Sequence, residues 1–161
     1  MNQNQPARAP AKPQGIKKRV FLVEDHALMR RSIVEAIERE PDLTICGQAE
    51  DGPAALAAIL SLPPDIVLTD IQLQSSSGLE LIKSLRGRWP TMPIVATTMF
   101  DVRRTERLVR AVGASAFVAK GDGPEQLIAV LRDVLGPGTG NELRAPHGQA
   151  GTSRASGHAE R

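Results

Sequence analysis

Five short apolar runs recur along the chain, and each is followed by a segment whose apolar residues repeat at helical spacing. The runs show little polar alternation, and they comprise Val20–Val23, Leu43–Cys46, Ile66–Leu68, Ile94–Ala96 and Ala116–Ala119. Such runs are typical of strands that are buried on both faces of a sheet. Strands that alternate with helices form parallel sheets with right-handed crossovers. The sequence therefore predicts an α/β fold, doubly wound, of five βα units with helices on both faces.

Local signals indicate where two of the helices begin. Ser77 and Glu80 have the spacing of a capping box, and Asp122 and Glu125 have the same spacing. Pro124 suits an early position in a helix, because the N–H that it lacks would have no partner there. We therefore expect one helix to follow Ser77 and another to follow Asp122.

The two ends of the chain differ in composition from the segment between them. Residues 1–17 are rich in Gln, Pro and Ala, and residues 136–161 are rich in Gly, Ser, Ala and Pro. Neither end can bury enough apolar surface to offset the entropy of ordering it. We predict one folded domain, residues 18–135, between a disordered basic N-terminal tail and a disordered C-terminal tail. No second apolar pattern follows Leu135, so we expect the domain to stand alone.

The charges of the chain are unevenly distributed. Residues 1–19 hold five Lys or Arg and no acid, whereas residues 20–135 hold 12 Lys or Arg and 16 Asp or Glu. The folded part is thus acidic, and we do not expect DNA binding by it. The single cysteine, Cys46, excludes an intramolecular disulfide, and no apolar run could span a bilayer. With no signal peptide either, we expect a cytoplasmic protein without a membrane partner.

Five polar residues stand where the predicted strands end. Glu24 and Asp25 follow the first strand, Asp70 ends the third, Thr98 the fourth and Lys120 the fifth. In open α/β sheets the functional crevice lies beyond the carboxyl ends of the strands. Each residue alone has an ordinary explanation as a cap, a strand-end hydroxyl or a surface charge. Their coincidence at five positions indicates one shared site.

These residue types supply the parts of a phosphoryl-transfer site. Three carboxylates on one edge repel each other, and Mg²⁺ is a hard cation that binds one or two carboxylates together with water and phosphate oxygens. A carboxylate can attack phosphorus and form an acyl phosphate. A lysine ammonium and a hydroxyl can then bind the remaining phosphoryl oxygens.

The motifs resemble those of bacterial response regulator receiver domains over residues 18–135. The segments that carry the resemblance are VFLVEDHALMRRSI, PDIVLTDIQL, SGLELIKSLR, MPIVATT and GASAFVAK. Asp25, Asp70, Thr98 and Lys120 are separated in turn by 45, 28 and 22 residues. The resemblance implies a flavodoxin-like (βα)5 fold with a five-stranded parallel sheet of order 2-1-3-4-5. It is closest to receivers that are usually joined to a helix-turn-helix output domain.

The resemblance also implies a role for each site residue. Asp70 would accept a phosphoryl group from a histidine kinase or a phosphotransfer protein. Asp25 and Asp70 would bind Mg²⁺ directly, Glu24 through water, and Gln72 through its backbone carbonyl. Glu24 stands where Asp is more frequent in the family, and its longer side chain should still reach a metal-bound water. Apart from phosphorylation and dephosphorylation of itself, the domain is not expected to be an enzyme.

Two further roles follow from the same resemblance. Thr98 and Lys120 would contact the phosphoryl group, and Phe117 would rotate with Thr98 as the switch. The switch would change the surface of the fourth helix, fifth strand and fifth helix, where a downstream target protein or a second copy of the chain would bind. The protein would then act as a diffusible regulator, a phosphorelay intermediate or a phosphate sink.

The predicted fourth helix has a basic face. Arg103, Arg107 and Arg110 share this face, with Arg104 adjacent. Such faces are most often simply solvated, and the alternative is that an acidic partner docks there.

Three other functions are compatible with parts of the sequence. A phosphatase of the haloacid dehalogenase type needs Asp-x-Asp-x-Thr after the first strand, whereas this chain reads Asp25-His26-Ala27-Leu28-Met29. A phosphorylation-independent receiver-like interaction module is the main alternative, because Met99 and Phe100 follow Thr98 where smaller residues are common. DNA binding through the basic N-terminal arm is a weaker possibility.

Overall fold

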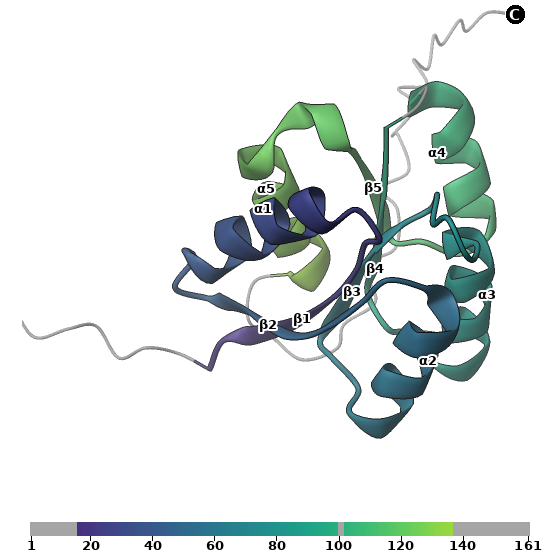
Figure 1. Ribbon diagram of the computed structural model, residues 1–161, viewed down its shortest axis with the longest axis horizontal. Coiled ribbons are helices and arrows are strands. Elements are labelled where there is room, and N and C mark those ends of the chain that lie inside the picture. The colour runs from purple at the N-terminus through teal and green to yellow at the C-terminus, as the bar shows by residue number, and fades with distance from the viewer. Residues whose placement is uncertain (1–15, 100–101, 137–161) are drawn as a thin grey trace, which may run out of the picture.

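The computed structural model describes residues 16–99 and 102–136, and it consists of parallel strands that alternate with helices (Figure 1). The strands are β1 (Lys18–Val23), β2 (Leu43–Ala49), β3 (Ile66–Asp70), β4 (Ile94–Thr98) and β5 (Ala116–Ala119). The helices are α1 (Ala27–Glu38), α2 (Gly52–Ser61), α3 (Gly78–Arg88), α4 (Val102–Ala111) and α5 (Pro124–Leu135). A short 3-10 turn, η1 (Lys120–Asp122), precedes α5. The predicted tails lie outside the described residues except for Ile16, Lys17 and Gly136.

The strands form one parallel sheet in the order β2-β1-β3-β4-β5, which confirms the predicted topology. Helices α1 and α5 cover one face, and α2, α3 and α4 cover the other (Figure 1). Successive strand side chains point to opposite faces, so each strand contributes to two separate cores. On β1, Val20 and Leu22 pack toward α1 and α5, whereas Phe21 and Val23 pack toward α2, α3 and α4.

Both predicted helix starts are confirmed, since α3 follows Ser77 and α5 begins at Pro124, but one of the two predicted caps is wrong. The Ser77 hydroxyl accepts a hydrogen bond from the Glu80 amide at 3.4 Å, as expected for a cap of α3. The capping box predicted for Asp122 and Glu125 is wrong. The residue that precedes α5 is Gly123, whose φ is +87°, and no side chain caps the start of this helix. The η1 turn points Asp122 backwards, and its carboxylate accepts from the Ala119 amide at 3.3 Å instead.

The start of α3 packs directly against the end of β3. A Cβ atom placed on Gly78 would lie 2.0 Å from the Asp70 carbonyl oxygen and 2.7 Å from the Ile71 Cα. The Gly78 amide also donates to the Ile71 carbonyl at 3.3 Å. Because the neighbouring atoms are backbone, they cannot rotate away, and position 78 therefore requires glycine.

We expect Gly78→Ala to lower the free energy of unfolding by about 3 kcal/mol, because the new methyl group forces the end of β3 away from α3. Gly87→Ala is the matched control, since Gly87 lies in the same helix with open space around its Cα. That variant should be more stable by about 0.5–1 kcal/mol, because alanine favours helix. Urea denaturation of the two variants measures both effects, and equal stabilities would contradict the close approach.

Arg132 connects α5 to the segment between α1 and β2. Its guanidinium binds both carboxylate oxygens of Asp42, at 2.8 and 2.5 Å, and Glu40 at 2.5 Å. The hydrogen bond from Arg132 holds the pKa of the Asp42 carboxyl below its usual range. The groups are largely exposed, so water screens the attraction.

We expect Asp42→Asn to lower the free energy of unfolding at pH 7 by about 0.5 kcal/mol, as for other exposed pairs. A carboxyl whose pKa is lowered by folding stabilises the protein above its ordinary pKa and loses that effect as pH falls through the folded value. The difference between the variant and the wild type should therefore shrink as the pH falls through the lowered pKa of Asp42. Thermal unfolding between pH 2.5 and 7 tests this, and a constant difference would speak against the pair.

Candidate functional site

Strand register brings the predicted polar residues to one edge of the sheet. In the pairing of β1 with β3, Val23 stands opposite Thr69, so that the next residues, Glu24 and Asp70, are neighbours. In the pairing of β4 with β5, Thr98 stands opposite Ala119, the residue before Lys120. The site lies at the carboxyl ends of β1 and β3, where the chain reverses its direction of winding.

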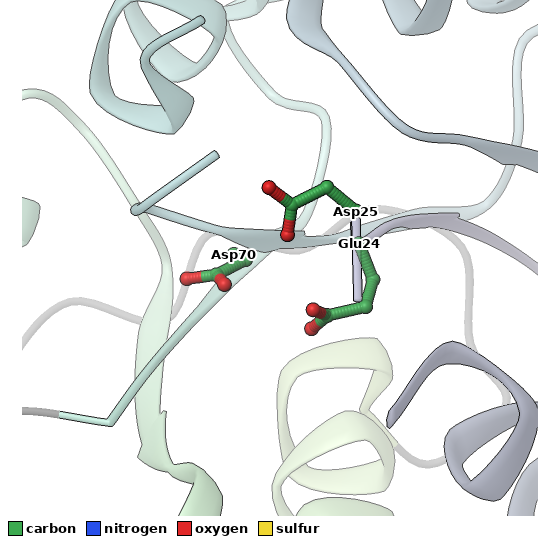
Figure 2. A group of neighbouring side chains, drawn as sticks. All are labelled: Glu24, Asp25 and Asp70. Carbon is green, nitrogen blue, oxygen red and sulfur yellow. The ribbon is translucent and has the colours of Figure 1, made fainter. Parts of the chain in front are cut away.

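Three carboxylates gather at this edge, as Figure 2 shows. One oxygen from each of Glu24, Asp25 and Asp70 lies within 4.8 Å of the others. Glu24 and Asp25 are consecutive, and their side chains leave the chain on opposite sides (Figure 2). Glu24 is 1% exposed and Asp70 is 5% exposed, whereas Asp25 is half-buried. Burial at such distances strengthens the repulsion between the carboxylates.

Lys120 supplies the cation that balances two of these carboxylates. Its ammonium lies 2.6 Å from Asp70 Oδ2 and 2.5 Å from Glu24 Oε2. Burial disfavours the charged ammonium, but the hydrogen bond with Asp70 and the attraction of Glu24 outweigh that effect and raise the pKa of Lys120. The lysine is therefore charged at neutral pH.

Backbone amides satisfy most of the remaining carboxylate oxygens. Asp70 Oδ1 accepts from the Gln72 amide at 2.9 Å, and Glu24 Oε1 accepts from the His26 amide at 3.2 Å. Asp25 Oδ2 accepts from the Gln74 amide at 2.6 Å. Among the described residues, Glu24 Oε2 is a buried oxygen outside hydrogen-bonding geometry, although the ammonium is close to it.

The donor set fits a hard divalent cation. Three carboxylates with oxygens within 4.8 Å of one another match the oxygen ligands that Mg²⁺ requires. Glu24, Asp25 and Asp70 could hold such an ion together, because the charge of Lys120 leaves about two negative charges uncompensated.

The other predicted site residues lie around this cluster. Thr98 is buried at the end of β4. Phe117 is half-buried in β5 and packs against the core beneath α2, α3 and α4. Met99 is 67% exposed, whereas Phe100 lies outside the described residues. The roles of Thr98, Phe117 and the Gln72 carbonyl stay predictions.

One residue of this region escaped the sequence analysis. Arg30 of α1 donates to the carbonyl oxygen of Glu24 at 2.7 Å. A cation in the first turn of a helix opposes the helix dipole, and that unfavourable position is the signal that could have singled it out.

The family model of the response regulator receiver domain matches residues 20–132. This chain belongs to that family. The described residues of the receiver domain contain no helix that is long and apolar enough to cross a membrane.

Individual relatives agree with this assignment. A protein-glutamate methylesterase/protein-glutamine glutaminase of Symbiobacterium thermophilum is 37% identical over 120 residues, which cover 73% of this chain and 33% of that protein. The DNA-binding transcriptional activator DevR/DosR of Mycobacterium tuberculosis is 31% identical over 127 residues, which cover 78% of this chain and 56% of that protein. The solved structure of a LuxR-family two-component response regulator from Aurantimonas sp. SI85-9A1 has a TM-score of 0.71 at 28% identity, covering 74% of this chain and 85% of that chain.

The receiver domain spans about a third to about half the length of the curated relatives that it matches. One of those relatives is named as a DNA-binding activator. The comparisons therefore do not support the expectation that DNA binding is absent.

We expect Lys120→Met to lower the free energy of unfolding by about 3 kcal/mol in metal-free buffer, because two buried carboxylates lose their cation. Mg²⁺ at millimolar concentration should reduce this deficit, since it supplies the missing positive charge. Lys83→Met is the control, because Lys83 pairs with Glu80 on the surface and should cost less than about 0.5 kcal/mol. Chemical denaturation with and without Mg²⁺ measures both variants, and equal losses would argue against the buried ion pair.

Proposed function

We propose that this receiver domain accepts a phosphoryl group on Asp70 from a histidine kinase or a phosphotransfer protein, in a Mg²⁺-dependent reaction. The observation that carries the proposal is the buried Asp70 carboxylate, which lies 2.6 Å from the Lys120 ammonium and beside Glu24 and Asp25. Two further acids at the same edge repel the Asp70 carboxylate and would not stabilise the fold. The arrangement suits a group that must attack an anionic phosphorus centre.

In the proposed reaction, a carboxylate oxygen of Asp70 attacks phosphorus and forms a new P–O bond. The bond from phosphorus to the donor breaks, and its electron pair leaves with the imidazole nitrogen of a phosphohistidine or the oxygen of a small acyl phosphate. The Lys120 ammonium would bind one oxygen of the resulting acyl phosphate, and the Thr98 hydroxyl would bind another.

The proposed metal ligands are the carboxylates of Asp25 and Asp70 and the backbone carbonyl of Gln72, with Glu24 bound through water. When bound, Mg²⁺ supplies positive charge that offsets the charge of the phosphoryl oxygens. The three carboxylates, whose oxygens lie within 4.8 Å of one another, support a cation at this edge.

The output would be a change of protein contacts. Phosphorylation adds nearly two negative charges and three acceptor oxygens to the site. Thr98 would move toward the new group, and Phe117 would turn into the space that it leaves. The affected surface comprises α4, β5 and α5, where a target protein or a second copy would bind. Arg107 and Arg110 of α4 are exposed there and suit an acidic partner, while the side chains of Arg103 and Arg104 lie outside the described residues.

Under this proposal the domain performs chemistry only on itself and works in the cytoplasm, where its kinase donates the phosphoryl group. The methylesterase relatives do not extend that activity to this chain, because the match covers only 33% of the first of them.

We expect acetyl phosphate or phosphoramidate with Mg²⁺ to add the mass of one phosphoryl group to the protein, and hydroxylamine to remove it. Asp70→Asn should abolish the modification, because the amide is not a nucleophile at physiological pH. Intact-protein mass spectrometry provides the measurement. Modification that survives in the Asn variant would refute the site. No modification, together with no response to beryllium fluoride, would favour the phosphorylation-independent module.

A further inference from the structure

The side chain of Arg30 contacts the loop that carries Glu24 and Asp25. Its Nη1 donates to the Glu24 carbonyl at 2.7 Å and, at 3.5 Å, to the Asp25 carbonyl. Its Nη2 pairs with Glu50 Oε1 at 2.8 Å. Arg30 is 18% exposed, whereas the neighbouring Arg31 is 78% exposed and pairs with Glu35 along its own helix. The two consecutive arginines thus have different environments.

The position of Arg30 is unfavourable unless these contacts compensate it. Helix α1 begins at Ala27, and its first turn contains no acidic residue. A cation near a helix N-terminus is repelled by the positive end of the dipole. The carbonyl oxygens of the preceding loop and the Glu50 carboxylate supply the negative charge that holds the guanidinium there.

The same contacts close a ring around the carboxyl ends of three strands. Arg30 joins the loop after β1 to Glu50 in the loop after β2. The Gln74 amide binds Asp25 and so joins the loop after β3 to the loop after β1. The Gly52 amide donates to the Ser76 hydroxyl at 2.9 Å, which joins the first residue of α2 to the loop after β3.

Within this ring Glu24 is held on both sides of its backbone. Its amide donates to the Ala49 carbonyl at 3.0 Å, and its own carbonyl accepts from Arg30. The backbone of Glu24 and Asp25 sets where the two side chains begin, and the amides of His26 and Gln74 hold the carboxylates themselves. Fixing that backbone therefore limits how far each carboxylate can move from Asp70.

We propose that Arg30 is a positioning residue for the cation site, which holds the backbone of Glu24 and Asp25 so that their carboxylates converge with that of Asp70. The inference rests on the proposed Mg²⁺ dependence. Arg30 would act through the two acids, since its guanidinium donates to their carbonyl oxygens and to Glu50. Groups that orient metal ligands in this way commonly change metal affinity by about 10- to 100-fold when they are replaced.

The direction in which Mg²⁺ affinity changes when Arg30 is replaced distinguishes positioning from simple electrostatics. Arg30 is a cation close to a site for a divalent cation, and removing it reduces repulsion between the two. Electrostatics alone would therefore make Mg²⁺ bind more tightly to a variant without the charge. Loss of positioning makes Mg²⁺ bind more weakly.

The test is isothermal titration of the full chain with MgCl2, at a temperature well below the unfolding transition. Arg30→Met keeps the length of the side chain without its donors, and we expect its Kd for Mg²⁺ to rise about 10-fold. Arg31→Met removes the neighbouring exposed charge and should leave Kd unchanged. Arg30→Lys should weaken binding by a few fold, because one ammonium cannot reach both the Glu24 carbonyl and Glu50.

A stability control excludes an indirect effect. Ile59→Val removes one methyl group from the core beneath α2 and should lower Tm without changing Kd, since Ile59 is fully buried in that core and is not one of the site residues. If Kd instead follows Tm in this variant, a purely structural role for Arg30 accounts for the data and the inference is overturned.

The outcomes distinguish this inference from the proposed function. If the wild type binds Mg²⁺ and the Kd of Arg30→Met is unchanged or lower, the role of Arg30 is overturned and the proposed function is unaffected. Absence of Mg²⁺ binding by the wild type overturns both. If Arg30→Met does not fold, Arg30→Lys decides, and a Kd equal to that of the wild type overturns the inference.

Discussion

The ammonium of Lys120 lies 2.6 Å from Asp70 and 2.5 Å from Glu24, and the acidic edge of the sheet depends on this contact. Asp70 and Glu24 have carboxylate oxygens within 4.8 Å of each other. Without a cation, two buried carboxylates this close would repel each other strongly. The lysine removes part of that cost and leaves the site with about two negative charges at neutral pH, because Asp25 is the third acid. The negative charge that is left over suits a divalent cation, which we propose to be Mg²⁺.

The parallel sheet makes that contact possible. Register places Glu24 beside Asp70, and the pairing of Thr98 with Ala119 delivers Lys120 to the same edge. The carboxyl ends of neighbouring strands meet there because the chain winds outward in both directions from β1 and β3. Gly78 contributes by allowing α3 to start directly against the Asp70 carbonyl, so that the residue at the centre of the site sits on closely packed backbone.

The loops at this edge are linked to each other as well as to the strands. Three pairs of residues make these links, namely Arg30 with Glu50, Gln74 with Asp25 and Ser76 with Gly52. Loops are usually the most variable part of such a fold, and side-chain to backbone hydrogen bonds are a common way to hold them. Here those bonds hold the backbone of Glu24 and the carboxylate of Asp25, two members of the acidic cluster.

The sequence by itself determined the alternation of strands and helices, the capping of α3 by Ser77, and the polar residues at the strand ends. Each of these depends on residues close together in the chain, where spacing directly reflects geometry. The strand order came from the resemblance to receivers, because spacing alone does not say which strands are neighbours.

Only the tertiary structure decided which groups meet. Lys120 pairs with both Glu24 and Asp70, Arg30 binds the backbone of Glu24, and Asp122 caps the η1 turn in place of α5. The first of these contacts joins residues 50 and more positions apart, and the others depend on how a loop or turn directs one side chain. The local sequence pattern predicts neither the long-range contacts nor the direction of these side chains, because register and loop conformation are set by the packing of the whole sheet and its helices.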